Sequence, residues 1–186
     1  QLNKLMVVLE SESHKPIANI MKMALFTGMR RSELLSLQWN DIDFEQGFIH
    51  IRNPKSGIDE KIPLNDAARN VIENQTKTES PYIFPGRSGK KIVDIKYSAN
   101  KIKEKAGLPK DFRPLHGLRH TYASMLASSG QVDMYTLQKL LTHKSPQMTQ
   151  RYAHLRDETL KKASNLAGEL INDVLNEARE ESKVVS

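Results

Sequence analysis

Residues 141–154 read Leu-Thr-His-Lys-Ser-Pro-Gln-Met-Thr-Gln-Arg-Tyr-Ala-His. The pattern predicts that a helix ends here, that Ser145 and Pro146 form a turn, and that a short helix then presents Tyr152. Two interpretations fit this segment. In one, it belongs to a DNA-binding helix-turn-helix, with Tyr152 packed in the core and His143 capping a helix. In the other, Tyr152 and His143 carry out chemistry on a phosphate.

A second segment, residues 116–120, reads His-Gly-Leu-Arg-His. At the opening of a helix, residues i and i+3 share a face, so His116 and Arg119 can converge on one target. A guanidinium binds two phosphate oxygens at once, and a histidine transfers protons near neutral pH. The alternative for the pair is a capping histidine and a surface ion pair.

A third segment, residues 27–35, reads Thr-Gly-Met-Arg-Arg-Ser-Glu-Leu-Leu. A glycine that ends one helix, followed by the start of another, places Arg30 beside amide N–H groups without partners, which favours an anion. The alternative is an ordinary corner between helices with solvated arginines. We expect Glu33 to serve structure, through a salt bridge or the dipole of the first helical turn.

Hydrophobic periodicity along the chain predicts an α+β domain, mainly helical, with one small antiparallel sheet. Pro16 suits the first turn of a helix that ends at Thr27-Gly28. The apolar face of this helix carries Ile17, Ile20, Met21, Ala24 and Leu25. Further helices are expected over 31–37, 65–76, 93–106, 118–129, 134–141, 147–154 and 158–181, and strands over 48–52, 61–64 and 82–84.

The composition describes one ordinary domain. The 186 residues are 38% hydrophobic and 27% charged, which is typical of neither a disordered chain nor a membrane-embedded one. The apolar runs are too short to span a bilayer, and the N-terminus lacks the pattern of a signal peptide. The absence of cysteine excludes disulfides, thiolate catalysis and cysteine-ligated zinc, and fits a cytoplasmic location.

The charge of the chain favours a polyanionic partner. The formal net charge is +6, but residues 157–186 contribute four basic and seven acidic side chains. Residues 1–156 therefore hold 24 basic and 15 acidic residues, a net charge of +9. We expect a polyanion to bind the body of the domain and not the tail.

Taken in order, the three segments resemble the catalytic domain of the tyrosine recombinases, the phage-integrase family. The resemblance extends from Gln1 to about Asp157 and is carried by residues 27–39, 116–124 and 143–154. It implies the fold of that domain and the activity of a site-specific recombinase or integrase, of the kind found on mobile elements. Two alternatives are DNA relaxation like that of a type IB topoisomerase and a non-catalytic helix-turn-helix DNA-binding protein.

The resemblance implies a mechanism as well. Tyr152 matches the nucleophile, and Arg30 and Arg119 match the paired arginines that hold the phosphate. A phenol ionises near a pKa of about 10, so Tyr152 needs cationic neighbours to favour its phenolate. The product is a 3′-phosphotyrosine, which keeps the energy of the phosphodiester for rejoining. The sequence contains no carboxylate pair built for magnesium, so we expect no metal or high-energy cofactor.

Three further residues complete the implied site. His116 is a base or an orienting donor, and His143 is a further donor. Lys55 matches the lysine that the family keeps in a β-hairpin turn, where it protonates the departing 5′ oxygen. Lys61 and Lys91 also lie near hairpin positions, so the identity of this lysine stays open.

The chain departs from the family pattern at Thr142, because many members have Leu-Gly-His where this chain has Leu-Thr-His. Threonine then has to accept a backbone conformation that glycine adopts readily, or the loop that carries His143 differs.

The expected organisation has two parts. Residues 1–156 form the catalytic domain, and residues 157–186 form a helical tail that is exchanged between subunits. We expect a homo-oligomer, a tetramer on DNA. The chain begins at Gln1, which suggests that an N-terminal DNA-binding domain is absent from it.

Overall fold

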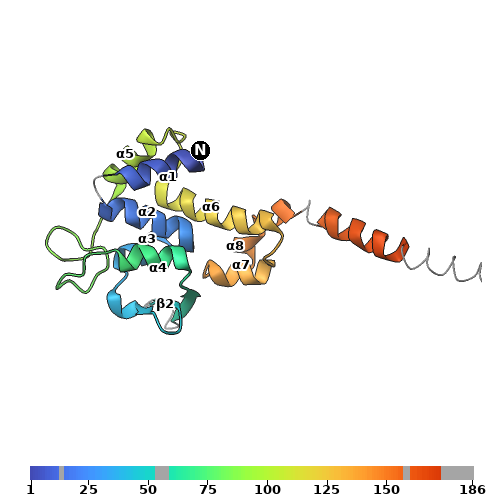
Figure 1. Cartoon of the computed structure of the whole chain (residues 1–186), viewed down its shortest axis with the longest axis horizontal. Coiled ribbons are helices and arrows are strands. Elements are labelled where there is room, and N and C mark those ends of the chain that lie inside the picture. Colours follow the sequence, from blue (N-terminus) through green and yellow to red (C-terminus); the bar gives the residue numbers. More distant parts are fainter. Residues whose placement is uncertain (13–14, 53–58, 157–159, 173–186) are drawn as a thin grey trace, which may run out of the picture.

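The computed structural model describes residues 1–12, 15–52, 59–156 and 160–172 of the chain. Figure 1 shows a helical body with a small sheet at one side. In chain order the elements are α1 (Leu2–Ser11), α2 (Lys15–Thr27), α3 (Arg31–Ser36), the 3₁₀ helix η1 (Trp39–Asp41), β1 (Ile42–Asp43), β2 (Phe48–Ile51), β3 (Glu60–Pro63), α4 (Asp66–Glu73), α5 (Lys96–Lys105), α6 (Pro114–Ser129), α7 (Met134–Leu140), α8 (Gln147–Gln150) and the 3₁₀ helix η2 (Ala153–Arg156).

Helix α2 is the centre of the main core. It packs against α1, α3, α4, α5 and α6, and Figure 1 shows it between α1 and α4. The apolar face predicted for it is confirmed, because Ile17, Ile20, Met21, Ala24 and Leu25 are all buried. A helix surrounded on so many sides has to be apolar around most of its circumference, and α2 also buries Ala18 and Met23.

Helix α6 joins the main core to a second, smaller one. Pro114 occupies its first turn, where the missing N–H costs nothing, and Gly130 ends it in the left-handed conformation at φ 71°. Leu115 and Leu118, near its start, belong to the main core. Further along, α6 contributes to the second cluster, whose buried members are Ala123, Ala127, Leu137, Leu141 and Tyr152.

The sheet is antiparallel, with strand order β1-β2-β3. Ile49 pairs with Ile42 on one side and with Ile62 on the other. Ile49 and Ile51 are buried whereas His50 is exposed, and this alternation is typical of a strand with one buried face, as expected over 48–52. The prediction that the fold is mainly helical with one small antiparallel sheet is therefore correct.

Four local predictions were wrong. The helix predicted over 147–154 is divided into α8 and η2, with a turn at residues 151–152. Residues 82–84 form no strand; Tyr82 makes only an isolated bridge to Gln38. Helix α6 begins at Pro114 instead of residue 118, and α5 begins at Lys96 instead of residue 93. The short run at 82–84 is apolar because Ile83 and Phe84 fill the core from an irregular segment, which is a burial signal and not a strand signal.

Beyond η2, residues 160–172 are helical and every one of them is exposed. Helix 160–172 thus covers part of the span predicted for the last helix. No helix in the described part of the chain has the length and apolar character that crossing a membrane requires.

Candidate active site

Arg30 is held where two helices meet. Gly28 ends α2 at φ +64°, and a Cβ added to it would lie 2.5 Å from a ring carbon of Tyr122. Both the backbone conformation and the close approach of this ring therefore require glycine. The turn places Arg30 at the N-cap of α3, as the sequence predicted for the start of a new helix.

Glu33 fixes the Arg30 guanidinium from within α3. The carboxylate accepts a hydrogen bond from the Arg30 backbone N–H at 2.7 Å and from Nη1 at 2.8 Å. The predicted structural role of Glu33 is confirmed. Because this pair is partly buried, the bond to a charged group restrains the guanidinium more than a surface ion pair would.

Thr142, which follows α7, binds the same guanidinium. Nη1 of Arg30 donates to Thr142 Oγ1 at 2.5 Å, and Nη2 donates to its carbonyl oxygen at 2.7 Å. Thr142 has a φ of 49°, so threonine does adopt the left-handed conformation that glycine would adopt more easily. It is the one non-glycine residue of the described chain with positive φ.

Arg119 lies beside Arg30 and is more deeply buried, at 8% exposure. Nη1 donates to the carbonyl of Gly28 and Nη2 to that of Leu141, each at 2.5 Å. Burial, and next the charge of Arg30, lower the pKa of Arg119 to about 10, which still leaves it protonated at neutral pH. A guanidinium has five N–H donors, so neither arginine has used its full set on these protein acceptors.

Tyr152 follows α8 and is only 6% exposed. Its Oη lies 2.5 Å from Nδ1 of His120, and Nε2 of His120 lies 2.8 Å from Nε2 of His116. Burial raises the pKa of Tyr152, and the nearby cations of Arg151 and Arg119 lower it by less. The expectation that cationic neighbours favour the phenolate is therefore outweighed in this structure by burial, and Tyr152 is a neutral phenol.

His143 approaches the same region from the loop after α7. Its Nδ1 lies 2.8 Å from Thr149 Oγ1, within α8. Burial, followed by the charges of Arg119, Arg30 and Arg151, lowers the pKa of His143 to about 4. At neutral pH the ring is neutral and has one N–H to donate.

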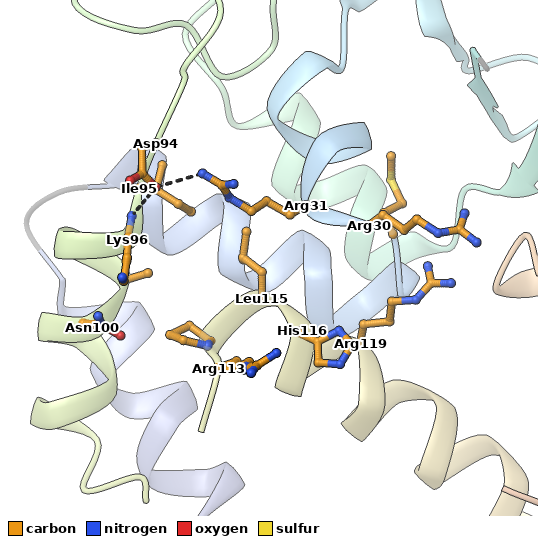
Figure 2. A pocket seen from close by; sticks show the side chains of 13 residues that line it. Arg30, Arg31, Asp94, Ile95, Lys96, Asn100, Arg113, Leu115, His116 and Arg119 are labelled. Carbon is orange, nitrogen blue, oxygen red and sulfur yellow. Dashed lines mark hydrogen bonds and ion pairs between the residues drawn. The ribbon is translucent and has the colours of Figure 1, made fainter. Parts of the chain in front are cut away.

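Two neighbouring hollows connect these groups. One cavity of about 230 Å³ is lined by His116, Arg119, His120, His143, Met148, Arg151 and Tyr152. A larger one of about 410 Å³ adjoins it and is lined by basic and apolar side chains together with Asp94 and Asn100. Figure 2 shows this second pocket, with the guanidinium groups of Arg30 and Arg119 side by side and His116 next to them.

The structure therefore brings together five of the six predicted site residues: Arg30, His116, Arg119, His143 and Tyr152. Lys55 lies outside the described residues. The sequence reasoning missed His120 and Arg151, which line the same cavity. A signal for His120 was present, because His116 and His120 are four residues apart and share a helical face.

Comparison with known proteins agrees with this arrangement. The model of the phage integrase family matches residues 1–159. The chain is similar to the tyrosine recombinase XerA of Saccharolobus solfataricus, with 35% identity over 156 residues that cover 78% of this chain and 50% of the relative. It is also similar to the integrase of Salmonella phage P22, with 33% identity over 77% of this chain and 40% of the relative.

Solved structures share the fold. A XerH recombinase bound to palindromic difH substrate in a post-cleavage complex superposes with a TM-score of 0.72 at 22% identity, over 90% of this chain and 51% of that one. The crystal structure of a XerA recombinase gives a TM-score of 0.72 at 23% identity, over 90% of this chain and 64% of that one. The chain spans about half the length of the curated relatives it matches. Since the family model covers all of the helical body and both arginine segments, the chain belongs to the phage integrase family.

Proposed function

We propose that this chain is the catalytic domain of a site-specific DNA recombinase that cuts and rejoins double-stranded DNA through a 3′-phosphotyrosyl intermediate. The observation that carries the proposal is one cavity lined by a tyrosine hydroxyl, a buried arginine and three histidines. Relatives named as tyrosine recombinases and integrases support it, as do similar structures bound to DNA. No metal or high-energy cofactor enters the chemistry.

In this reaction Tyr152 Oη attacks the phosphorus as the bond from phosphorus to the 5′ oxygen breaks. Arg30 and Arg119 stabilise the charge that develops on the non-bridging oxygens, with donors that their protein contacts leave available. His143 donates a further hydrogen bond. Lys55 supplies the proton that the departing 5′ oxygen requires. In the reverse direction a 5′ hydroxyl attacks the phosphotyrosine and releases Tyr152.

The DNA backbone follows the larger pocket, which is lined by Arg31, Lys96 and Arg113 next to the two site arginines. Phosphate groups are held by such cations whatever the base sequence, so these contacts position the duplex and do not select a site. Residues 1–156 form this catalytic unit. Residues 157–186 form a tail that docks on a neighbouring subunit of a tetramer, and a separate N-terminal domain contributes to recognition.

The test is covalent capture from a library of nicked duplexes with randomised sequence, analysed on a denaturing gel. The wild-type chain is expected to form a protein–DNA adduct with a subset of the library. Tyr152→Phe removes only the attacking oxygen, so the adduct disappears while DNA binding persists. Tyr135→Phe, at an exposed tyrosine of α7, is the matched control and retains the adduct. An adduct formed by the Tyr152→Phe chain contradicts the assignment.

A further inference from the structure

The nucleophile assigned above is the first member of a chain of three side chains. Tyr152 Oη contacts His120 Nδ1 at 2.5 Å, and His120 Nε2 contacts His116 Nε2 at 2.8 Å. The two imidazoles meet edge to face, with centroids 4.3 Å apart and an interplanar angle of 88°. His120 therefore uses both of its ring nitrogens, one toward the tyrosine and one toward the first histidine of the motif.

The direction of the hydrogen bonds follows from the burial of Tyr152. A buried hydroxyl proton needs an acceptor, and His120 Nδ1 is the one found for Tyr152 in the described part of the chain. His120 is then neutral with its proton on Nε2, which it donates to Nε2 of His116. His116 carries its own proton on Nδ1 and is exposed, so the far end of the chain opens toward solvent.

We propose that His120 is a catalytic residue that takes the proton from Tyr152 during attack and passes its own Nε2 proton to His116. This proposal rests on the proposed function, since it concerns the same reaction. His116 is then the final proton acceptor. His120, to which the sequence motif assigned no role, makes the direct contact with the nucleophile.

The protons balance in both directions. In cleavage, the O–H bond of Tyr152 breaks as its oxygen bonds to phosphorus, and the proton moves to His120 Nδ1. The proton on His120 Nε2 moves to His116 Nε2, so the pair ends with one positive charge, located on His116. The 5′ oxygen takes its proton from Lys55. In rejoining, each proton returns along the same path and Tyr152 leaves as a phenol.

The surroundings keep the two histidines ready to accept. Partial desolvation by the surrounding protein, followed by the charges of nearby basic groups, lowers the pKa of both rings, so both are neutral at pH 7. The charged and titratable groups that face the pair are Arg113, Arg119, His143, Arg151 and Tyr152. All of these groups are cationic or neutral at pH 7. A bound phosphate supplies the negative charge that stabilises the imidazolium once the proton has reached His116.

The test compares two substitutions of His120 on a nicked duplex isolated by covalent capture. In His120→Asn the amide stands where Nδ1 stood, so a hydrogen-bonding partner for Tyr152 is kept while the path to His116 is cut. In His120→Gln the amide stands where Nε2 stood and the contact with Tyr152 is lost. Under the relay, both variants cleave at least about a hundredfold more slowly at pH 7, with DNA affinity unchanged. If His120 only positions Tyr152, the Asn variant cleaves at nearly the wild-type rate.

The pH profile separates proton transfer from positioning. Without the relay, Tyr152 has to lose its proton to hydroxide. The ratio of the wild-type cleavage rate to that of His120→Asn is therefore expected to fall about tenfold for each pH unit above 7. A ratio that stays constant with pH overturns the proposal. His154→Asn, at an exposed histidine two residues beyond the nucleophile, is the matched control and retains the wild-type rate.

A sulfur leaving group identifies the step. When sulfur replaces the bridging 5′ oxygen, it departs as a thiolate without protonation, because thiols ionise near a pKa of about 8.5. On this duplex, His120→Asn is expected to cleave as slowly relative to the wild type as before, whereas Lys55→Ala regains cleavage. Rescue of His120→Asn by sulfur places His120 at the leaving group and overturns the relay. Absence of an adduct with the wild-type chain instead overturns the proposed function itself, and with it the relay.

Discussion

Thr142 combines an unfavourable backbone conformation with a favourable contact. A left-handed conformation costs a non-glycine residue about 1–2 kcal/mol. Against this, Thr142 Oγ1 accepts a hydrogen bond from the charged guanidinium of Arg30, and such bonds contribute about 1.5–3 kcal/mol. The two magnitudes are similar, so the threonine is tolerated because its hydroxyl has a charged partner 112 residues away in the chain.

Two substitutions separate the cost of the left-handed backbone from the gain of the hydrogen bond. Thr142→Ala keeps the positive φ and loses the hydrogen bond, so the free energy of unfolding is expected to fall by about 1–2 kcal/mol. Thr142→Gly loses the same bond but relieves the backbone, so it is expected to be about 1 kcal/mol more stable than the alanine variant. Urea titration of both variants measures the difference. A glycine variant less stable than the alanine variant would show that backbone strain is not the governing term.

His143 makes stability depend on pH. Its pKa falls from the ordinary value of 6.5 to about 4 in the folded protein, so the unfolded chain binds a proton more readily. The stabilisation is complete above pH 6.5 and is lost as the pH falls from 6.5 toward 4. The wild-type chain is expected to lose more stability between pH 7 and pH 5 than His143→Gln does. His154→Gln, at an exposed histidine, is expected to behave as the wild type, and equal losses in all three chains would contradict the assignment.

The residues of the site were predictable to the extent that their signals are local. Spacing along one helix predicted that His116 and Arg119 share a face, and the turn at Gly28 predicted the position of Arg30. Contacts between distant segments left no such signal, so the bond from Arg30 to Thr142 could not be predicted. The neutral state of Tyr152 depends on how deeply it is buried, which no local pattern specifies.

At the scale of elements, long periodic helices were predicted well and short or irregular segments were not. Helix α2 was correct because its apolar positions repeat over three turns. Strand β1 has two residues, too few to show alternation, and Ile83 and Phe84 are apolar without belonging to a strand. In long elements the pattern of apolar residues indicates both burial and the type of secondary structure. In short segments it indicates burial alone, because tertiary contacts decide the conformation.

The exposed helix 160–172 carries the clearest prediction at this scale. Leu160, Leu170 and Ile171 are 64%, 58% and 61% exposed and lie on one face with Ala163 and Ala167. An apolar face that is exposed in the described part of the chain suits a neighbouring subunit. Truncation after Asp157 is expected to leave DNA binding by the monomer intact and to abolish multi-subunit complexes and strand exchange.

Native gel electrophoresis on a duplex with two sites, together with a strand-exchange assay, measures both effects. Leu170→Asp places a charge on the apolar face and is expected to reproduce the truncation. Asn165→Asp, on the opposite face of the same helix, adds the same charge and is expected to have little effect. Normal assembly of the truncated chain would contradict the role of the tail.

The whole molecule is expected to bind DNA mainly through its charge. Residues 1–156 have a net charge of +9, and each phosphate contact releases counterions, so log affinity falls by about 0.9 per contact for each decade of salt. About six contacts would reduce affinity about a thousandfold between 50 and 200 mM salt. Arg113→Ala, in the basic pocket, is expected to reduce this slope by about one contact. Lys162→Ala, on the acidic tail, leaves the slope unchanged unless the tail also binds DNA. Fluorescence anisotropy at several salt concentrations measures both slopes.

Arg119 links the two hydrophobic clusters. Its guanidinium donates to the carbonyl of Gly28, which precedes Met29 of the main cluster, and to the carbonyl of Leu141 in the smaller one. Loss of this side chain would leave two buried carbonyls without donors and would loosen the junction between the clusters. A chain that loses this arginine is thus expected to lose stability of the fold together with the proposed activity. A chain that loses only the hydroxyl of Tyr152 keeps the junction, so it is expected to remain folded while it loses the proposed cleavage.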